Sequence, residues 1–321
     1  MNIFRKTAVA ALLLGASLAF AQSYPNKPIR IVVGGAAAGL ADNVLRVNAD
    51  ALSAKLGVPL VIDNQPGAGS VVASGLVARS APDGYTLRWG GSGGLELIPS
   101  AVKLPYDPEK ALLPVVKVAG VYLAFAVSPK HVPAKNMAEL VALAKKSPGQ
   151  MSFSSNGIGT TLHMNIELLK ARAGIDVIHV PYKVNSLAIQ DILTGRIHAM
   201  SLAGSVVQSH LHSGNLALLA VTGPQRDPLF PNVPTMIESG YPGFVVGDFY
   251  GIFGPAGLPK EIVQRLGADF AAVASTDAFA AQIAKMGVTR HILQSDDFTR
   301  EIAAERKLWH TLVRERNIKI E

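Results

Sequence analysis

The stretch of sequence that decides the fold is IRIVVGGAAAGLAD, residues 29–42. Ile29–Val33 forms a short strand-like run, and Gly34–Ala41 follows it as a loop of small residues. Asp42 is a helix-capping residue type and predicts a helix that runs to about Leu56. A strand that passes through a short loop into a helix is the first half of a βαβ unit.

The same alternation continues downstream. Strand-like runs cover Pro59–Asp63 and Thr86–Trp89, with a helical pattern over Val71–Ser80 between them. Loops rich in glycine and proline, Asn64–Gly69 and Pro82–Gly84, separate these segments. The resulting βαβαβ order predicts a parallel sheet covered by helices.

A second series of alternating strand and helix signals begins at residue 123. Its members are Leu123–Val127, Met137–Ser147, Met151–Phe153, Leu162–Ala173, Val177–Val180, Leu187–Thr194, Ile197–Ser201 and Leu216–Val221. A proline-rich connector, Thr222–Pro234, is followed by a strand at Phe249–Phe253 and helices at Lys260–Ala274, Asp277–Met286 and from Ser295 to about Arg316. Two series of about 100 residues each predict an α/β protein with two lobes. We expect residues 22–122 and 223–321 to form lobe 1, residues 123–222 to form an inserted lobe 2, and a ligand cleft between them.

The composition is that of a folded protein with a sizeable core. Of the 321 residues, 49% are hydrophobic and 17% charged, which excludes a disordered chain. Cysteine is absent, so disulfides, thiol catalysis and Cys-ligated metals are excluded. The formal net charge is +7, but no basic block stands out, which favours anionic solutes over nucleic acid as partners. We expect no cofactor and no metal.

The N-terminus has the three parts of a secretory signal peptide. Arg5 and Lys6 are followed by an apolar and small-residue run, Ala8–Phe20, and by an A-x-A site that predicts cleavage after Ala21. The alternative is a buried N-terminal helix. No cysteine sits at the cleavage site, which argues against a lipoprotein anchor.

The loop SSNGIGTT, residues 154–161, is the most informative candidate for binding. It holds two glycines, four hydroxyl residues and no charge, and it lies between a strand-like run and a helical pattern. Free N–H groups and the dipole at a helix N-terminus favour a bound anion. This chemistry suits holding a small acid more than transforming it, although an ordinary helix cap is the simpler interpretation.

Two motifs suggest other chemistry. The run GGSGG, residues 90–94, matches the G-x-S-x-G nucleophile elbow around Ser92, but Pro99 interrupts the helix that should follow. We therefore expect a loop that lets backbone approach a ligand. The run from Gly67 begins like a dinucleotide fingerprint, but Val72 stands where the third glycine belongs.

Several segments together carry a resemblance to a known family. They are YPNKPIRIVV (24–33), NQPGAG (64–69), APDGYTL (81–87), LPYDP (104–108), SNGIGTTLH (155–163), HVPYK (179–183), PNVPT (231–235) and GPAGLPK (254–260). In these segments the chain resembles the Bug-type periplasmic solute receptors of tripartite tricarboxylate transporter systems. The resemblance implies a type II, Venus-flytrap periplasmic binding protein that captures a small organic carboxylate and is not an enzyme. It implies delivery to membrane permease subunits, or to a sensor kinase if the receptor is an orphan, and we expect a monomer.

The resemblance also implies which residues bind the ligand. In such receptors two loops clamp a carboxylate through amides, hydroxyls and waters, and they correspond here to Gly34–Asp42 and Ser154–His163. The expected ligand-binding residues are Gly35, Ala38, Gly39, Leu40, Asp42, Gly91, Ser92, Ser155, Asn156, Gly159, Thr160, Thr161, His163, Lys183, Ala203 and Phe249. A serine hydrolase using Ser92 remains the competing hypothesis.

The departures from the family pattern bear on the ligand. The first loop lacks the family's prolines, and Leu40 and Ala41 replace small and hydroxyl residues. The segment Met200–Gly204 replaces one that contains an aspartate, which argues against a ligand amine. We therefore expect a more apolar cleft and a monocarboxylate or aromatic acid.

Overall fold

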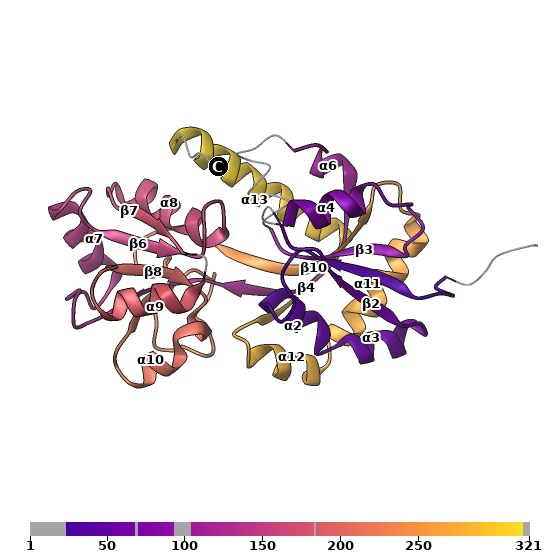
Figure 1. Ribbon diagram of the computed structural model, residues 1–321, viewed down its shortest axis with the longest axis horizontal. Helices are drawn as coiled ribbons and strands as arrows, with labels where there is room; N and C mark the ends of the chain where they lie inside the picture. Colours follow the sequence, from indigo (N-terminus) through magenta and orange to yellow (C-terminus); the bar gives the residue numbers. More distant parts are fainter. Residues whose placement is uncertain (1–23, 68–69, 93–103, 183, 317–321) are drawn as a thin grey trace, which may run out of the picture.

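The chain folds into two lobes, each built on one β-sheet (Figure 1). The computed structural model describes residues 24–67, 70–92, 104–182 and 184–316. The expected signal peptide, residues 1–21, lies outside these ranges. Within them, no helix is both long enough and apolar enough to cross a membrane.

The sheet of the first lobe has six strands in the order β11-β4-β10-β3-β1-β2. Their bounds are β1 Ile29–Val33, β2 Leu60–Asn64, β3 Thr86–Gly90, β4 Leu112–Tyr122, β10 Gly247–Pro255 and β11 Thr289–Gln294. Strands β2, β1 and β3 are parallel, as the βαβαβ order predicts. Strands β10, β4 and β11 are antiparallel to their neighbours, so the sheet is mixed and the prediction of a parallel sheet was only half right. Neither β4 nor β11 was expected from the sequence.

Helices cover both faces of this sheet. On one face α2 (Leu40–Arg46), α3 (Ala49–Leu56), α11 (Lys260–Ala274) and α12 (Asp277–Ala284) pack over the larger part of the core. On the other face lie α4 (Val71–Ala78), the short α6 (Pro108–Ala111) and the start of α13 (Ser295–Arg316). The single helix expected from Asp42 to Leu56 is broken at Asn48, whose backbone leaves the helical region between α2 and α3.

The second lobe has a five-stranded sheet in the order β7-β6-β8-β5-β9. Its strands are β5 Ala124–Val127, β6 Ser152–Ser155, β7 Ile178–Pro181, β8 Ala199–Leu202 and β9 Ala217–Val221. Its helices are α7 Met137–Lys146, α8 Thr161–Ala173, α9 Asn185–Leu193, the 3-10 turn η4 Gly204–Val207 and α10 Gln208–His212. Helices α7 and α8 bury apolar residues on one face, and α9 and η4 on the other.

The lobes are joined where β4 ends and β10 begins. These two strands pair antiparallel as far as Gly247 opposite Tyr122, so both chain crossings belong to one hydrogen-bonded ribbon. Thr222 fastens this point: its fully buried hydroxyl accepts from the Leu123 N–H at 2.7 Å and donates to the Val246 carbonyl.

Two segments outside residues 123–222 pack against the second lobe. Met236 and Phe244, from the segment after Thr222, are fully buried in its core. The end of α13 adds Trp309 to the same core, whereas Phe298 near its start is buried in the first lobe. Helix α13 therefore spans both lobes (Figure 1). We propose that residues 235–246 move with lobe 2, and the other lobe boundaries stay a prediction.

Thr222→Val should destabilise the hinge. Valine keeps the shape but removes the acceptor of the Leu123 N–H and the donor to the Val246 carbonyl, and a buried donor without a partner costs about 1–3 kcal/mol. We expect that loss in the free energy of unfolding measured with urea. Thr194→Val, at an exposed threonine whose hydroxyl bonds the Gln190 carbonyl, is the matched control and should change stability by less than about 0.5 kcal/mol. Equal effects of the two substitutions would contradict the role of Thr222.

Candidate functional site

The expected loops of the first lobe lie at one edge of its sheet. Strands β1 and β3 run parallel in register, with Val33 opposite Trp89, so the residues that follow both strands emerge side by side. These are the loop Gly34–Gly39 and the pair Gly91–Ser92. The start of β10 reaches the same edge, because Gly251 pairs with Gly90. Ligands of open α/β sheets bind at such carboxyl ends of strands.

Asp42 organises the first loop from inside. Its carboxylate is buried and accepts hydrogen bonds from the Ala38 N–H (2.9 Å), Arg46 Nε (2.7 Å) and Asn64 Nδ2 (3.0 Å). Burial alone would raise its pKa, but these hydrogen bonds and the Arg46 charge hold the pKa of Asp42 below its ordinary value. Asp42 therefore shapes the loop, and its carboxylate already accepts hydrogen bonds from three protein groups.

The strain in this loop sits at Ala38. Its φ of 61° lies in the left-handed region, which is uncommon for a residue with a side chain. The Asp42 carboxylate holds its N–H, and Asn43 Nδ2 donates to its carbonyl at 3.1 Å. Helix α2 then begins at Leu40 with no side-chain cap, so its first N–H groups have no acceptor from a cap.

The second loop ends in a capped helix N-terminus. Thr160 is the N-cap of α8: its hydroxyl accepts from the His163 N–H at 3.2 Å and donates to the Gly157 carbonyl at 2.9 Å. The Gly159 N–H donates to His163 Nδ1 at 3.1 Å. Thr161 and Leu162 are the first two helical residues, and their N–H groups have no acceptor within the helix. These two donors are the ones that α8 can offer to an anion.

Two stacked histidines support this loop from below. The rings of His163 and His179 lie 3.9 Å apart and nearly parallel. His179 Nε2 is 2.7 Å from the hydroxyl of Ser155, which donates to the Gly157 carbonyl. Burial, the neighbouring His163 and Lys170 lower the pKa of His179 to about 3, and burial also lowers the pKa of His163. Both rings are therefore neutral at pH 7, and their contacts are with the loop.

One hydrogen-bond chain connects the two lobes at the site. Asp248, at the start of β10, accepts at Oδ1 from the N–H of Ser92 (2.8 Å), the hydroxyl of Ser92 (3.0 Å) and the N–H of Phe249 (2.9 Å). The Ser92 hydroxyl is also 3.2 Å from the hydroxyl of Thr161, the first residue of α8. We call this chain, Asp248–Ser92–Thr161, the junction.

The junction depends on a glycine. A Cβ at Gly91 would lie 2.0 Å from Asp248 Oδ1 and 2.6 Å from the Phe249 carbonyl oxygen. Only a residue without a side chain lets the Asp248 carboxylate lie against this backbone. The GGSGG run was expected to let backbone approach a ligand; at Gly91 the group that approaches the backbone is a carboxylate of the same chain, and Gly93 and Gly94 lie outside the described residues.

The expected ligand-binding residues fall into groups. Gly91, Ser92 and Thr161 meet at the junction, and Gly35, Ala38, Gly39 and Leu40 lie at the adjacent sheet edge. Asp42, Ser155, Gly159, Thr160 and His163 make hydrogen bonds that shape the two loops, and Asn156 is exposed. Ala203 packs against the core of the first lobe, and Lys183 lies outside the described residues. The ring of Phe249 is 2% exposed and packs on Phe298, so its N–H, not its ring, is at the junction.

Asp248 was missed. Its main partner is 156 positions away in the sequence, and a lone aspartate before an aromatic strand carries no local signal of that contact. The Gly90–Gly91 pair indicated that something approaches the backbone, but not what.

The structure gives no support to Ser92 as a nucleophile. Its described hydrogen-bond partners are an aspartate and a threonine, whereas an activated serine needs a general base such as histidine within reach. Among the described residues there is also no cluster of His, Asp and Glu that could hold a metal ion.

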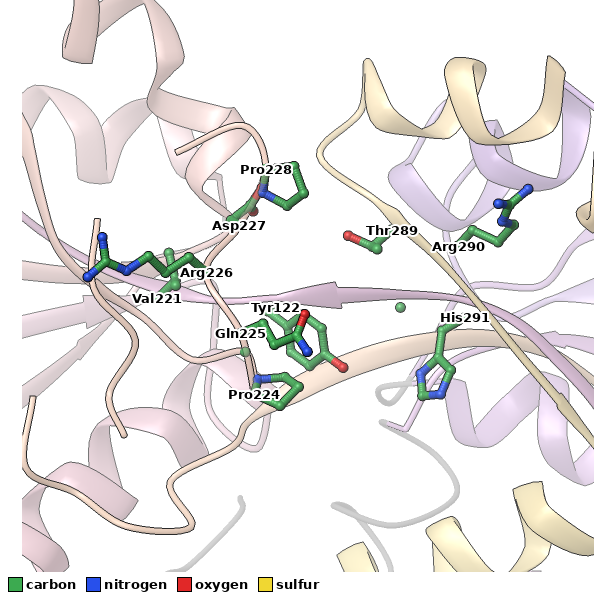
Figure 2. Close-up of a pocket in the computed structure, with 12 residues that line it drawn as sticks. Tyr122, Val221, Pro224, Gln225, Arg226, Asp227, Pro228, Thr289, Arg290 and His291 are labelled. Carbon is green, nitrogen blue, oxygen red and sulfur yellow. The ribbon is translucent and has the colours of Figure 1, made fainter. Parts of the chain in front are cut away.

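A groove of about 400 Å³ lies at the hinge. Its lining includes Tyr122 at the end of β4, Gln225 after Thr222, and Thr289 and His291 of β11 (Figure 2). Arg226 also borders it, but its guanidinium pairs with Glu238 and points away from the groove in this view. None of the residues expected to bind ligand is among its lining.

Comparisons with known proteins identify the family of the chain. The sequence pattern of the "Tripartite tricarboxylate transporter family receptor" matches residues 44–318. The chain belongs to this receptor family. The receptor is 34% identical to Protein BugT of Bordetella pertussis over 329 residues, 100% of each chain. The expected resemblance to Bug-type receptors is confirmed.

Solved structures confirm the two-lobed fold. Rpa4515 of R. palustris, whose structure contains adipate, has a TM-score of 0.79 at 28% identity, over 92% of the receptor and 99% of that chain. MatC of Rhodopseudomonas palustris, with bound malate, has a TM-score of 0.75 at 26% identity, over 90% and 100%. Periplasmic binding proteins are thus the structural relatives of this receptor.

Gly91→Ala should disrupt the junction. The new methyl group would overlap both Asp248 Oδ1 and the Phe249 carbonyl oxygen. The Asp248 carboxylate or strand β10 must therefore shift. We expect a loss of roughly 1–3 kcal/mol in the free energy of unfolding, typical of overpacking. Gly35→Ala is the control, because its Cβ would meet only Ala41 at 3.9 Å. Equal melting temperatures of the two variants would contradict the close contact.

Acid should weaken the stacked histidines. A histidine whose folded pKa is lowered to about 3 stabilises the fold above its ordinary value of 6.5, and that contribution is lost as the pH falls from 6.5 towards 3. We expect the melting temperature of His179→Gln to fall less than that of the unsubstituted receptor between pH 6.5 and acid pH. His212→Gln, at an exposed residue of α10, should leave the slope unchanged. Parallel curves for His179→Gln and the unsubstituted receptor would refute the prediction.

Proposed function

We propose that this receptor captures a small organic carboxylate between its lobes, with the carboxylate bound at the N-terminus of α8. The observation that carries the proposal is the pair of N–H groups of Thr161 and Leu162, which have no helical acceptor, in a helix start whose Thr161 hydroxyl contacts Ser92 of the other lobe. The helix dipole favours negative charge at this position.

The relatives support this ligand class. The solved structures of Rpa4515 and MatC contain adipate and malate, both carboxylates. The uncapped start of α2 and the strained Ala38 loop face the same sheet edge and would add donors from the first lobe. A ligand that contacts both lobes stabilises the closed arrangement by the difference between its affinities for the closed and open arrangements.

The rest of the role follows from the family. We propose that the precursor is cleaved after Ala21, that the mature receptor works in the periplasm as a monomer without enzymatic activity, and that the closed form docks on membrane permease subunits. A sensor kinase is the alternative recipient. Co-purification of the receptor with the permease subunits in the presence of ligand, but not in its absence, distinguishes the two.

Thr161→Pro tests the helix N-terminus directly. Proline is tolerated at the first helical position, where the lost N–H has no intrahelical partner. Thr160 has φ −85° and ψ 161°, the extended conformation that a residue before proline adopts. The substitution therefore removes one donor to the ligand and leaves the helix intact.

The matched control is Thr161→Val, which removes the hydroxyl and keeps the N–H. Calorimetric titration against malate, adipate and other small acids should show that proline weakens binding more than valine, by about 1.5–3 kcal/mol, or roughly 10- to 150-fold. Equal affinities of the two variants would remove the α8 N-terminus from the site. Absence of binding by every acid to the unsubstituted receptor would overturn the proposed function itself.

A further inference from the structure

In the junction, one of the two carboxylate oxygens of Asp248 accepts no hydrogen bond from the described residues. All three hydrogen bonds that Asp248 accepts go to Oδ1. No hydrogen bond or ion pair to Oδ2 is found from the described residues. Asp248 is partly exposed, so the second oxygen is not sealed in the core. A polar atom that protein groups leave unpaired at a ligand site is one that a ligand can pair with.

The hydrogen bonds around it have a fixed polarity. An ionised carboxylate only accepts, so the Ser92 hydroxyl donates its single hydrogen to Asp248. Towards Thr161 the Ser92 oxygen must then accept, and the Thr161 hydroxyl donates to it at 3.2 Å. The hydrogens of both hydroxyls are used within the junction. Neither hydroxyl is left to donate to a ligand.

The two sides of the site therefore differ. On the Asp248 side the groups on offer are acceptors: Oδ2 of Asp248 and the lone pairs of Ser92 and Thr161. On the α8 side the groups on offer are the N–H donors of Thr161 and Leu162. A second carboxylate placed against Oδ2 of Asp248 would face a negative charge at close range, which is unfavourable.

We propose that Asp248 is a specificity residue that selects a carboxylate ligand carrying an ammonium or hydroxyl group and discriminates against dicarboxylates. The inference rests on the proposed carboxylate site at α8. Ser92 is one hydrogen bond from Asp248 (3.0 Å) and one from Thr161 (3.2 Å), so the ligand's donor and its carboxylate are separated by only a few bonds. The ligand class is a short amino acid or hydroxy acid.

This assignment changes the expectation drawn from the sequence. The absence of a carboxylate in Met200–Gly204 argued against a ligand amine. Asp248 supplies a carboxylate from the other lobe, and Gly91 is the glycine that makes room for it. The apolar first loop is compatible with the short carbon chain of such a ligand.

Four acids of equal chain length test the proposal. They are butyrate, 4-hydroxybutyrate, 4-aminobutyrate and succinate, which differ only in the group at the far end. In calorimetric titrations of the unsubstituted receptor we expect 4-aminobutyrate or 4-hydroxybutyrate to bind at least tenfold more tightly than succinate. This order needs no variant and stands as a test even if substitutions at 248 impair folding.

The variant Asp248→Asn tests the contribution of the negative charge of Asp248. Asparagine can keep an acceptor for Ser92 and Phe249 but presents an NH₂ donor in place of Oδ2. We expect it to weaken 4-aminobutyrate at least tenfold and to strengthen succinate. Asp176→Asn, at an exposed aspartate of the second lobe, is the matched control and should change neither affinity.

The outcomes separate the two proposals. Succinate binding as tightly as the amino and hydroxy acids, or an unchanged preference in Asp248→Asn, would overturn the specificity role and leave the carboxylate site standing. Binding of adipate with no binding of any four-carbon acid would also overturn it. Failure of every acid, adipate and malate included, would overturn the proposed function.

Discussion

The antiparallel pairing of β4 with β10 is the constraint on which the rest of the structure depends. Both chain crossings between the lobes run through this ribbon, and the Thr222 hydroxyl ties it to the first residues of the second lobe. Because β10 also pairs with β3, the same strand that joins the lobes carries Asp248 to the end of β3, beside Gly91 and Ser92. The hinge and the candidate site are therefore parts of one strand, and a shift of β10 moves both.

That placement explains how an otherwise ordinary helix start acquires selectivity. The N-terminus of α8 favours any anion. Asp248, held by three donors at one oxygen, sets the direction of the hydrogen bonds through Ser92 to Thr161 and turns the neighbouring hydroxyls into acceptors. Two helix-end donors on one side and acceptors on the other favour an asymmetric ligand. This polarity arises from the relation between the lobes and from neither lobe alone.

The sequence predicted what is local and missed what is long-range. The βαβαβ run, the strand-to-helix loops and a helix cap within residues 154–161 follow from periodicity and residue type, and the structure has them, with Thr160 as the cap. Strand β4 was not predicted because its eleven residues, Leu112–Tyr122, contain a proline and a glycine, which are unfavourable in strands. The Asp248–Ser92 contact escaped because it joins residues 156 positions apart. The sequence places His163 among the expected ligand-binding residues, whereas in the structure its ring stacks on His179 and its Nδ1 accepts from the Gly159 N–H of the loop.

The motion that would admit a ligand is limited by a third connection. Helix α13 buries Phe298 in the first lobe and Trp309 in the second, so the lobes can separate only by sliding or bending against this helix as well as at Thr222. The polar contacts that the described residues make directly between the lobes include Ser92 with Thr161, and Ser205 Oγ with the Met286 carbonyl at 3.1 Å. Each neutral hydrogen bond contributes only about 1 kcal/mol net. Such contacts alone favour the closed arrangement of the lobes only weakly. A ligand whose two ends bind α8 and Asp248 can therefore shift the equilibrium to the closed arrangement.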